Sequence, residues 1–186
     1  MEQFDARFFL TVLHLVGLAV GLGGALFGDR LFFLATKNRV ISRDEYTSLK
    51  RAGQFTWWGL ILLMFSGIGL FALDPARYMD STKFLSKMAV VSVIAINGAI
   101  FHSIHFKKFK QLIGTHLPQS RVFKKASAGM FISGAVSVVS WLFALALGSL
   151  RSLPFSVLEI LFVYALLLAG AVCVSLFLHA HFFWRK

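Results

Sequence analysis

Histidine is the residue type with the most chemical potential in this chain. A neutral imidazole can ligate a transition metal or relay a proton through either ring nitrogen. Five of the six histidines lie in or at the ends of apolar runs: His14, His102, His105, His179 and His181. An ionisable group in an apolar run is costly to keep, so these five are the first candidates for a site.

Glycines follow His14 in the run LHLVGLAVGLGGALFG. If the run is helical, at about 100° per residue, Gly17, Gly21, Gly24 and Gly28 fall on one side of the helix with His14. Two interpretations are open. Glycines give a flat macrocycle room beside a helix backbone, in which case Gly17 and Gly21 would contact a cofactor. The same stripe also fits small-xxx-small packing of two helices without a ligand.

The elements that must position these residues are membrane helices. Of the 186 residues, 58% are hydrophobic, 21 are phenylalanine and 15% are charged. A water-soluble domain of this size needs more polar surface, so the composition predicts an all-α integral membrane helix bundle. The polar stretches between apolar runs are short. We therefore expect one membrane domain over residues 1–186, in contact with the lipid bilayer.

Five apolar segments reach, or nearly reach, the length of about 20 residues that spans a bilayer. They are residues 8–27, 55–73, 84–104, 128–147 and 155–178. Lysine and arginine gather in the loops after the first and third segments and at the C-terminus. The positive-inside rule then predicts an N-terminus outside and a C-terminus in the cytoplasm. This rule and anionic lipids account for the net charge of +11 without nucleic-acid binding.

Two groups of ionisable residues are expected at different depths. His14, Lys87 and Glu159 enter their segments at similar depths near the outer face, so they could meet. Lys87 and Glu159 are candidates for charge neutralisation and proton relay, although both could simply reach the outer headgroups. Near the inner face, one of His102 and His105 could face one of His179 and His181, or these rings could rest in the interface.

Two imidazoles on different helices form the usual ligand set of a membrane b-type haem. We therefore predict haem b as cofactor, with metal ligands among His14, His102 and His179. Copper or zinc transport is less well supported, because the embedded segments lack pairs of cysteine or methionine and Lys107 and Lys108 flank the inner histidines.

The first 110 or so residues carry a resemblance to a known group. The phrases LHLVGLAVGLGGALF, DRLFFL, FTWWGLILLMFSGIGL and KFLSKMAVVSVIAINGAIFH resemble small bacterial membrane proteins that include HemJ-type protoporphyrinogen oxidases and CopD-like families. The resemblance implies haem b and important residues at His14 and Lys87. HemJ-type proteins carry a further histidine about ten residues after the lysine, where this chain has Asn97.

These observations predict a haem b protein of the bacterial inner membrane that transfers electrons, with a quinone or a redox protein as partner. One alternative is a HemJ-like oxidoreductase that oxidises a porphyrinogen. Another is a non-catalytic subunit or assembly factor, either self-associated as a homo-oligomer or docked in a larger complex through its glycine face.

Overall fold

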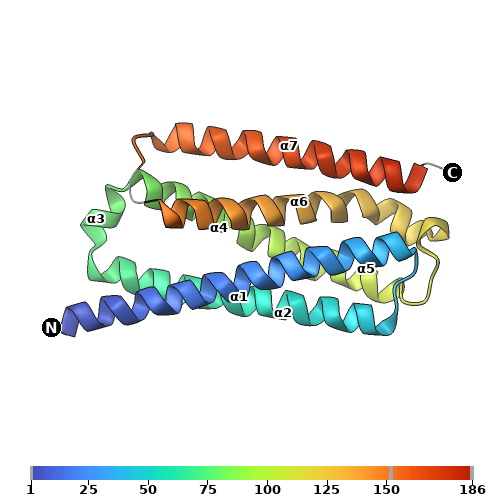
Figure 1. The fold of residues 1–186 in the computed structure, drawn as a ribbon, viewed down its shortest axis with the longest axis horizontal. Coiled ribbons are helices and arrows are strands. Elements are labelled where there is room, and N and C mark those ends of the chain that lie inside the picture. The colour runs from blue at the N-terminus through green and yellow to red at the C-terminus, as the bar shows by residue number, and fades with distance from the viewer. Residues whose placement is uncertain (1, 151–152, 185–186) are drawn as a thin grey trace.

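The computed structural model describes residues 2–150 and 153–184 and is almost entirely helical (Figure 1). The long helices are α1 (Glu2–Asn38), α2 (Arg43–Leu73), α4 (Thr82–Ile100), α6 (Arg121–Ser149) and α7 (Val157–Trp184). Shorter elements join them: α3 (Pro75–Met79), a π-helix (Phe101–His105), α5 (Phe106–Gln111) and a 3₁₀ turn (Leu117–Gln119). The predicted all-α class is confirmed.

Five helical segments are long and apolar enough to cross a membrane, as predicted. Their bounds are Asp5–Asn38, Arg43–Leu73, Thr82–Gln111, Arg121–Ser149 and Val157–His181. Each one is longer than the apolar segment that predicted it, although the second ends at the same residue and the last begins at Val157, two residues after the predicted start. The third segment runs through the π-helix into α5, and the first continues well past Phe27.

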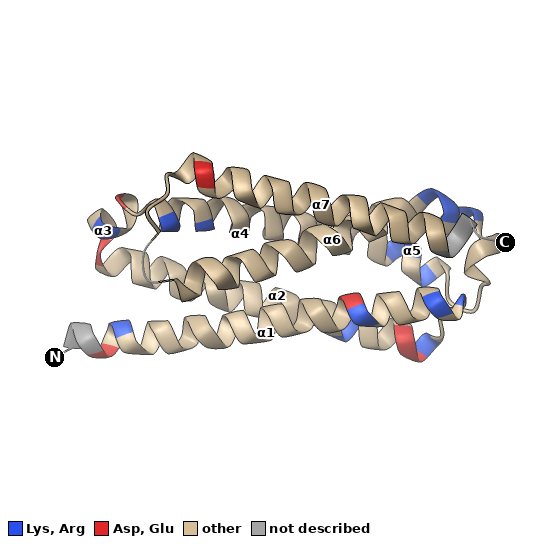
Figure 2. Cartoon of the chain, turned by 45° about the horizontal axis from the view of Figure 1, so that its top comes forward, with Lys and Arg blue, Asp and Glu red and all other residues tan. Residues whose placement is uncertain are grey.

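The helices form two layers, with the α1–α2 hairpin in one and α4, α6 and α7 in the other (Figure 1). Lysine and arginine gather at one end of the bundle, where α1 ends and α2 and α6 begin (Figure 2). We call this the basic end, and the end where α1 begins and α6 finishes the opposite end. The two layers therefore have chemically distinct ends.

The loops of the basic end hold the two layers together. The amide of Gly114 donates to the Ile41 carbonyl oxygen at 2.9 Å. The amide of Leu117 donates to the Arg39 carbonyl oxygen at 2.8 Å. Arg39 and Gly114 provide the two left-handed backbone positions that these turns need, with φ of 61° and 73°. Below the loops lies an aromatic core that includes Phe32, Phe109 and Phe123.

Helix starts follow from local sequence. Ser42 caps α2 in a capping box, because its hydroxyl accepts from the Glu45 amide at 3.1 Å and its own amide donates to Glu45 Oε2 at 2.8 Å. The hydroxyls of Ser81 and Ser120 cap α4 and α6 in the same position. Each cap fixes where a long helix of the bundle begins.

Candidate functional site

The His14 ring is held by a serine of the neighbouring helix. Its Nδ1 atom lies 3.0 Å from Ser66 Oγ on α2. The Ser66 hydroxyl has one hydrogen, and its Oγ lies 2.6 Å from the Leu62 carbonyl oxygen. When the Ser66 hydroxyl gives its hydrogen to this carbonyl oxygen or to that of Leu63, 3.2 Å away, its Oγ accepts from the tautomer of His14 that carries its hydrogen on Nδ1. The Nε2 atom is then left with a free lone pair.

Lys87 of α4 lies at the same end of the bundle as His14. Its Nζ is 3.5 Å from the position that a Cβ would take on Gly148 of α6, and its charge acts electrostatically on the His14 ring. Within the described residues Lys87 forms no ion pair, whereas the neighbouring Lys83 donates to the Leu150 carbonyl oxygen.

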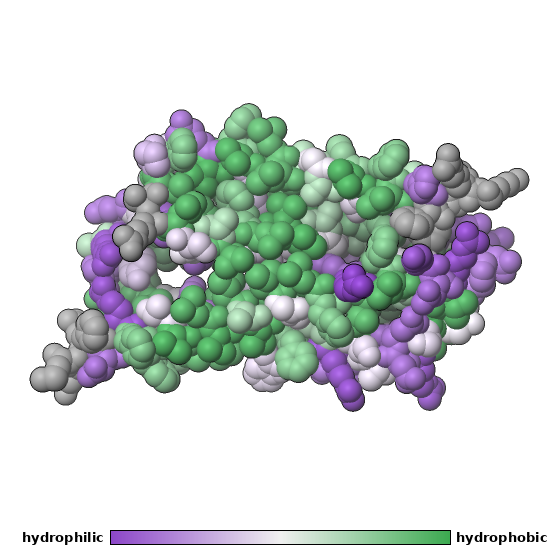
Figure 3. Space-filling model, in the orientation of Figure 1, coloured by the Kyte–Doolittle hydropathy of each residue, from purple (hydrophilic) through white to green (hydrophobic). Residues whose placement is uncertain are grey.

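At the opposite end, Figure 3 shows a gap between the layer of α1 and the layer above it. Gly67 lies beside the His14 ring, 3.6 Å from its Cε1 when a Cβ is built on the glycine, and Gly148 lies beside Lys87. We call His14, Ser66, Lys87 and these two glycines the opposite-end site.

Glu159 does not belong to the opposite-end site. Its Oε2 accepts hydrogen bonds at 2.8 Å from both the amide and the hydroxyl of Ser156, and its own amide donates to Ser156 Oγ at 3.3 Å. This is a capping box at the start of α7, and the side chain is exposed. The contact with His14 and Lys87 expected from depth alone is absent for Glu159, because its carboxylate is used by its own helix.

The histidines of the basic end make separate contacts. His105 is buried against Gly129 of α6, with its Cε1 3.3 Å from a Cβ built there. His179 of α7 has its Nε2 2.8 Å from Ser127 Oγ, also on α6. Both rings thus rest on α6 backbone or on its small side chains, and these contacts do not fit a macrocycle held between the two histidines.

The two other histidines near the basic end, His102 and His181, have different neighbours. His102 is exposed and lines a cavity between α1, α2, α4 and α6, described below. His181 stacks on Phe177 of its own helix with ring centroids 6.3 Å apart. In the described part of the chain, no three His, Cys, Asp or Glu side chains come together as a group that could hold a metal ion.

The glycine stripe of α1 is used for helix packing. A Cβ on Gly17 would lie 2.9 Å from the Leu63 amide nitrogen of α2, and one on Gly21 would lie 2.3 Å from the Trp141 ring of α6. From the other side, a Cβ on Gly59 would lie 2.2 Å from Gly21. Protein atoms therefore occupy the space beside Gly17 and Gly21 that a cofactor would need, which favours the small-xxx-small interpretation.

One acidic residue inside a helix escaped the sequence prediction. Asp29 follows the predicted end of the first apolar segment, yet α1 continues for two more turns beyond it. Its carboxylate lines the same cavity as His102. The signal was present in FGDRLFFLA, because apolar residues resume directly after the charged pair.

Comparison of the chain with models of protein families, with curated proteins and with solved structures finds no match. The resemblance to HemJ-type and CopD-like proteins stays a prediction.

Proposed function

We propose that this chain is a membrane haem b protein in which His14 ligates the iron at the opposite-end site. The proposed topology has five spans, with the opposite end outside and the basic end in the cytoplasm, in a bacterial inner membrane. Lysine and arginine at the basic end support this direction, because positively charged loops remain on the cytoplasmic side (Figure 2).

The observation that carries the proposal is the hydrogen-bonded state of His14. Histidines that ligate metals usually donate their other ring N–H to an acceptor, which fixes the tautomer and the ring orientation. His14 has this arrangement in the tautomer whose Nδ1 donates to Ser66 Oγ and whose Nε2 keeps its lone pair. The donor set fits one axial position of a haem iron.

Lys87 provides the charge that the rest of the cofactor needs. Haem propionates are anionic, and an ammonium group with no carboxylate partner in a partly buried place attracts them. The side chains of His14 and Lys87 pack directly on Gly67 and Gly148. When bound, a haem would supply one-electron redox chemistry, while His14, Ser66 and Lys87 bind and orient it.

A second candidate is the oxidoreductase alternative, in which a bound substrate is oxidised. One observation favours it over simple electron transfer to a quinone or a redox protein. His14 is the one histidine at the opposite end among the described residues, so a haem held there would have one imidazole ligand from these residues. Haem enzymes keep the other axial position for a substrate or oxidant, whereas electron-transfer haems commonly fill both.

The experiment is a haem-binding measurement on the purified, detergent-solubilised chain, produced with haem precursor in the medium. We expect one haem per chain and a reduced spectrum with the α-band of a b-type haem. His116→Ala, in a loop of the basic end, is the matched control and should keep the same haem content. A colourless chain that also fails to take up added haem would refute the proposal.

Carbon monoxide separates the two candidates. A reduced haem with one protein ligand binds carbon monoxide and shifts its Soret band, whereas a haem with both axial positions filled does not respond. We expect the shift. An unchanged spectrum would favour the electron-transfer function and would require a second ligand that the described histidines do not supply.

A further inference from the structure

Asp29 is the strongest unexplained feature of the molecule outside the opposite-end site. It lies on α1 eight residues before Lys37, which is about 12 Å along the helix axis. Its neighbour Arg30 is exposed, whereas Asp29 Oδ2 is fully buried. The carboxyl group therefore points into the bundle, away from the adjacent guanidinium.

Neither oxygen of this carboxyl group forms a hydrogen bond with the residues that the structure describes. Oδ2 has no hydrogen-bond partner among the described residues, and Oδ1 rests 3.3 Å from a Cβ built on Gly134 of α6. A buried carboxylate without a partner costs several kcal/mol or more. Asp29 is therefore expected either to carry a proton or to hold a cation that the structure does not contain.

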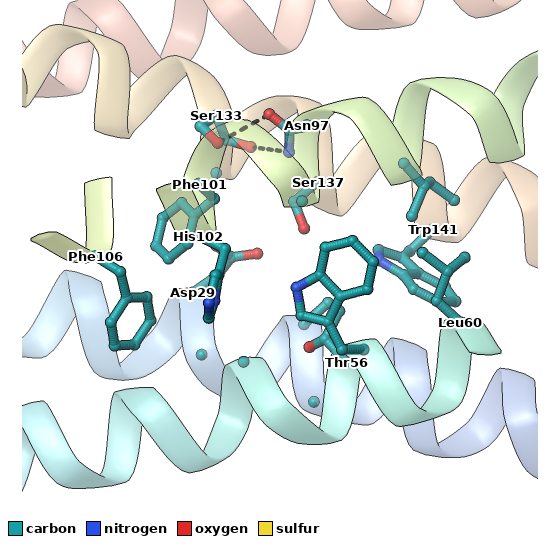
Figure 4. A pocket seen from close by; sticks show the side chains of 18 of the residues that line it. Asp29, Thr56, Leu60, Asn97, Phe101, His102, Phe106, Ser133, Ser137 and Trp141 are labelled. Carbon is teal, nitrogen blue, oxygen red and sulfur yellow. Dashed lines mark hydrogen bonds between the residues drawn. The ribbon is translucent and has the colours of Figure 1, made fainter. Parts of the chain in front are cut away.

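The space in front of Asp29 is a cavity of about 90 Å³ between α1, α2, α4 and α6. In the view of Figure 4, Asp29 and His102 lie toward one end, Trp141 lies toward the other, and Ser137 lies between them. Asp29 thus faces a partly open space between the helices, which other side chains do not fill.

Two polar residues of the cavity wall already satisfy each other. Asn97 Nδ2 donates to the Ser133 carbonyl oxygen at 3.0 Å, and Ser133 Oγ donates to Asn97 Oδ1 at 2.8 Å (Figure 4). The Ser137 hydroxyl, by contrast, forms no hydrogen bond within the described part of the chain, and it points into the cavity in Figure 4. The Asp29 carboxylate and the Ser137 hydroxyl oxygen are therefore two acceptors of the cavity that the described residues leave free, beside the Thr56 hydroxyl oxygen and the His102 ring.

The rest of the lining selects the kind of cation. Four aromatic side chains contribute to the wall: Trp57, Phe101, Phe106 and Trp141. Aromatic faces attract ammonium groups, whereas a bare metal ion needs several oxygen ligands at once. The size sets a further limit, because a cavity of about 150 Å³ is filled by benzene. Only a cation of a few non-hydrogen atoms fits.

We propose that the cavity binds a small primary ammonium ion, with its N–H groups on Asp29 and Ser137 and its alkyl part against the aromatic rings. The cavity is separate from the opposite-end site, so the ammonium proposal can be tested independently of the haem proposal. Its chemical class is that of methylammonium, which serves as the probe.

The test is a titration of the purified full chain with methylammonium chloride, with sodium chloride replaced in equal amounts to hold the ionic strength. Trp57 and Trp141 line the cavity, so tryptophan fluorescence reports occupancy. We expect a saturable change. In Asp29→Asn the affinity should fall about 100-fold, because a charge-assisted hydrogen-bonded pair is lost. Asp44→Asn, which changes an exposed acid of the same type, should titrate like the unaltered chain.

Several results would overturn the proposal. These are the absence of a saturable change, an equal response to sodium, an equal response to tetramethylammonium, which has no N–H donor, and an unaltered affinity in Asp29→Asn. If Asp29→Asn does not fold, Ser137→Ala provides the test. It removes one neutral hydrogen bond and should weaken methylammonium binding about fivefold. Unaltered affinity in Ser137→Ala would also overturn the proposal.

Discussion

The Nδ1 atom of His14 lies 3.0 Å from the Ser66 hydroxyl oxygen, which lies 2.6 Å from the Leu62 carbonyl oxygen. When the hydroxyl donates to this carbonyl, His14 Nδ1 is the donor to Ser66 Oγ. The contact joins α1 to α2 and orients the ring. It gives one ring nitrogen a hydrogen-bond partner within the apolar helices and leaves the lone pair of Nε2 in a fixed direction. The proposed haem function depends on this relationship.

Replacing Ser66 should therefore weaken haem binding without removing the ligand. In Ser66→Ala the His14 ring loses its acceptor and can rotate or change tautomer. Loss of such a supporting contact typically costs 10- to 100-fold in metal affinity, and we expect a fall of about that size in a haem titration.

Ser140→Ala is the matched control for Ser66→Ala. Ser140 is also buried, and its Oγ contacts the Val136 carbonyl oxygen and the Tyr164 hydroxyl instead of a histidine. Its haem affinity should equal that of the unaltered chain. Equal haem affinities in Ser66→Ala, Ser140→Ala and the unaltered chain would show that Ser66 does not orient a ligand.

Lys87→Met should reduce haem affinity about tenfold, because a charge-assisted contact to a propionate is lost. Lys87→Arg keeps the charge and should recover most of the affinity. The measurement is again haem titration by absorbance, with Lys110→Met at the basic end as the control. If Lys87→Met and Lys110→Met bind haem equally well, the propionates do not lie near Lys87.

The glycine contact between α1 and α2 predicts a large effect on stability. A methyl group on Gly59 would lie 2.2 Å from the Gly21 backbone, which cannot move without separating the helices. Gly59→Ala should lower the free energy of unfolding by about 3 kcal/mol, at the upper end of the range for overpacked sites. Thermal unfolding in detergent measures this loss.

Gly23→Ala is the control for the glycine contact, because a Cβ at Gly23 meets nothing within 4 Å. It should leave the thermal midpoint unchanged or raise it, since alanine is the better helix former by about 1 kcal/mol. Similar midpoints for Gly59→Ala and Gly23→Ala would mean that α1 and α2 are not packed as closely as described.

Hydropathy predicted the five long helices because a run of about 20 apolar residues has the length and composition of a membrane-spanning helix. It could not predict where each helix ends, since helices continue through the interface on capping and loop contacts. Asp29 was missed for this reason. Its burial depends on Gly134 and on the cavity, which belong to helices far away in the sequence.

The positions of His14, Lys87 and Glu159 within their apolar segments predicted that the three side chains could meet. The structure instead shows Glu159 bonded to Ser156 at the start of its own helix. The sequence SVLE at Ser156 is a capping box, a local signal that explains Glu159 without a distant partner. For the inner histidines, the spacing could not show that His105 and His179 each rest on α6. Such contacts depend on the rotation of each helix about its axis, which packing sets.

The most direct test of the central claim is the reduced-minus-oxidised absorbance spectrum of two single variants, measured beside the unaltered chain. We predict that His14→Ala loses the α-band of b-type haem, whereas His179→Ala, which removes the ring bonded to Ser127, keeps it at full height. An α-band that persists in His14→Ala and disappears in His179→Ala would contradict the account, because it would place the iron at the basic end.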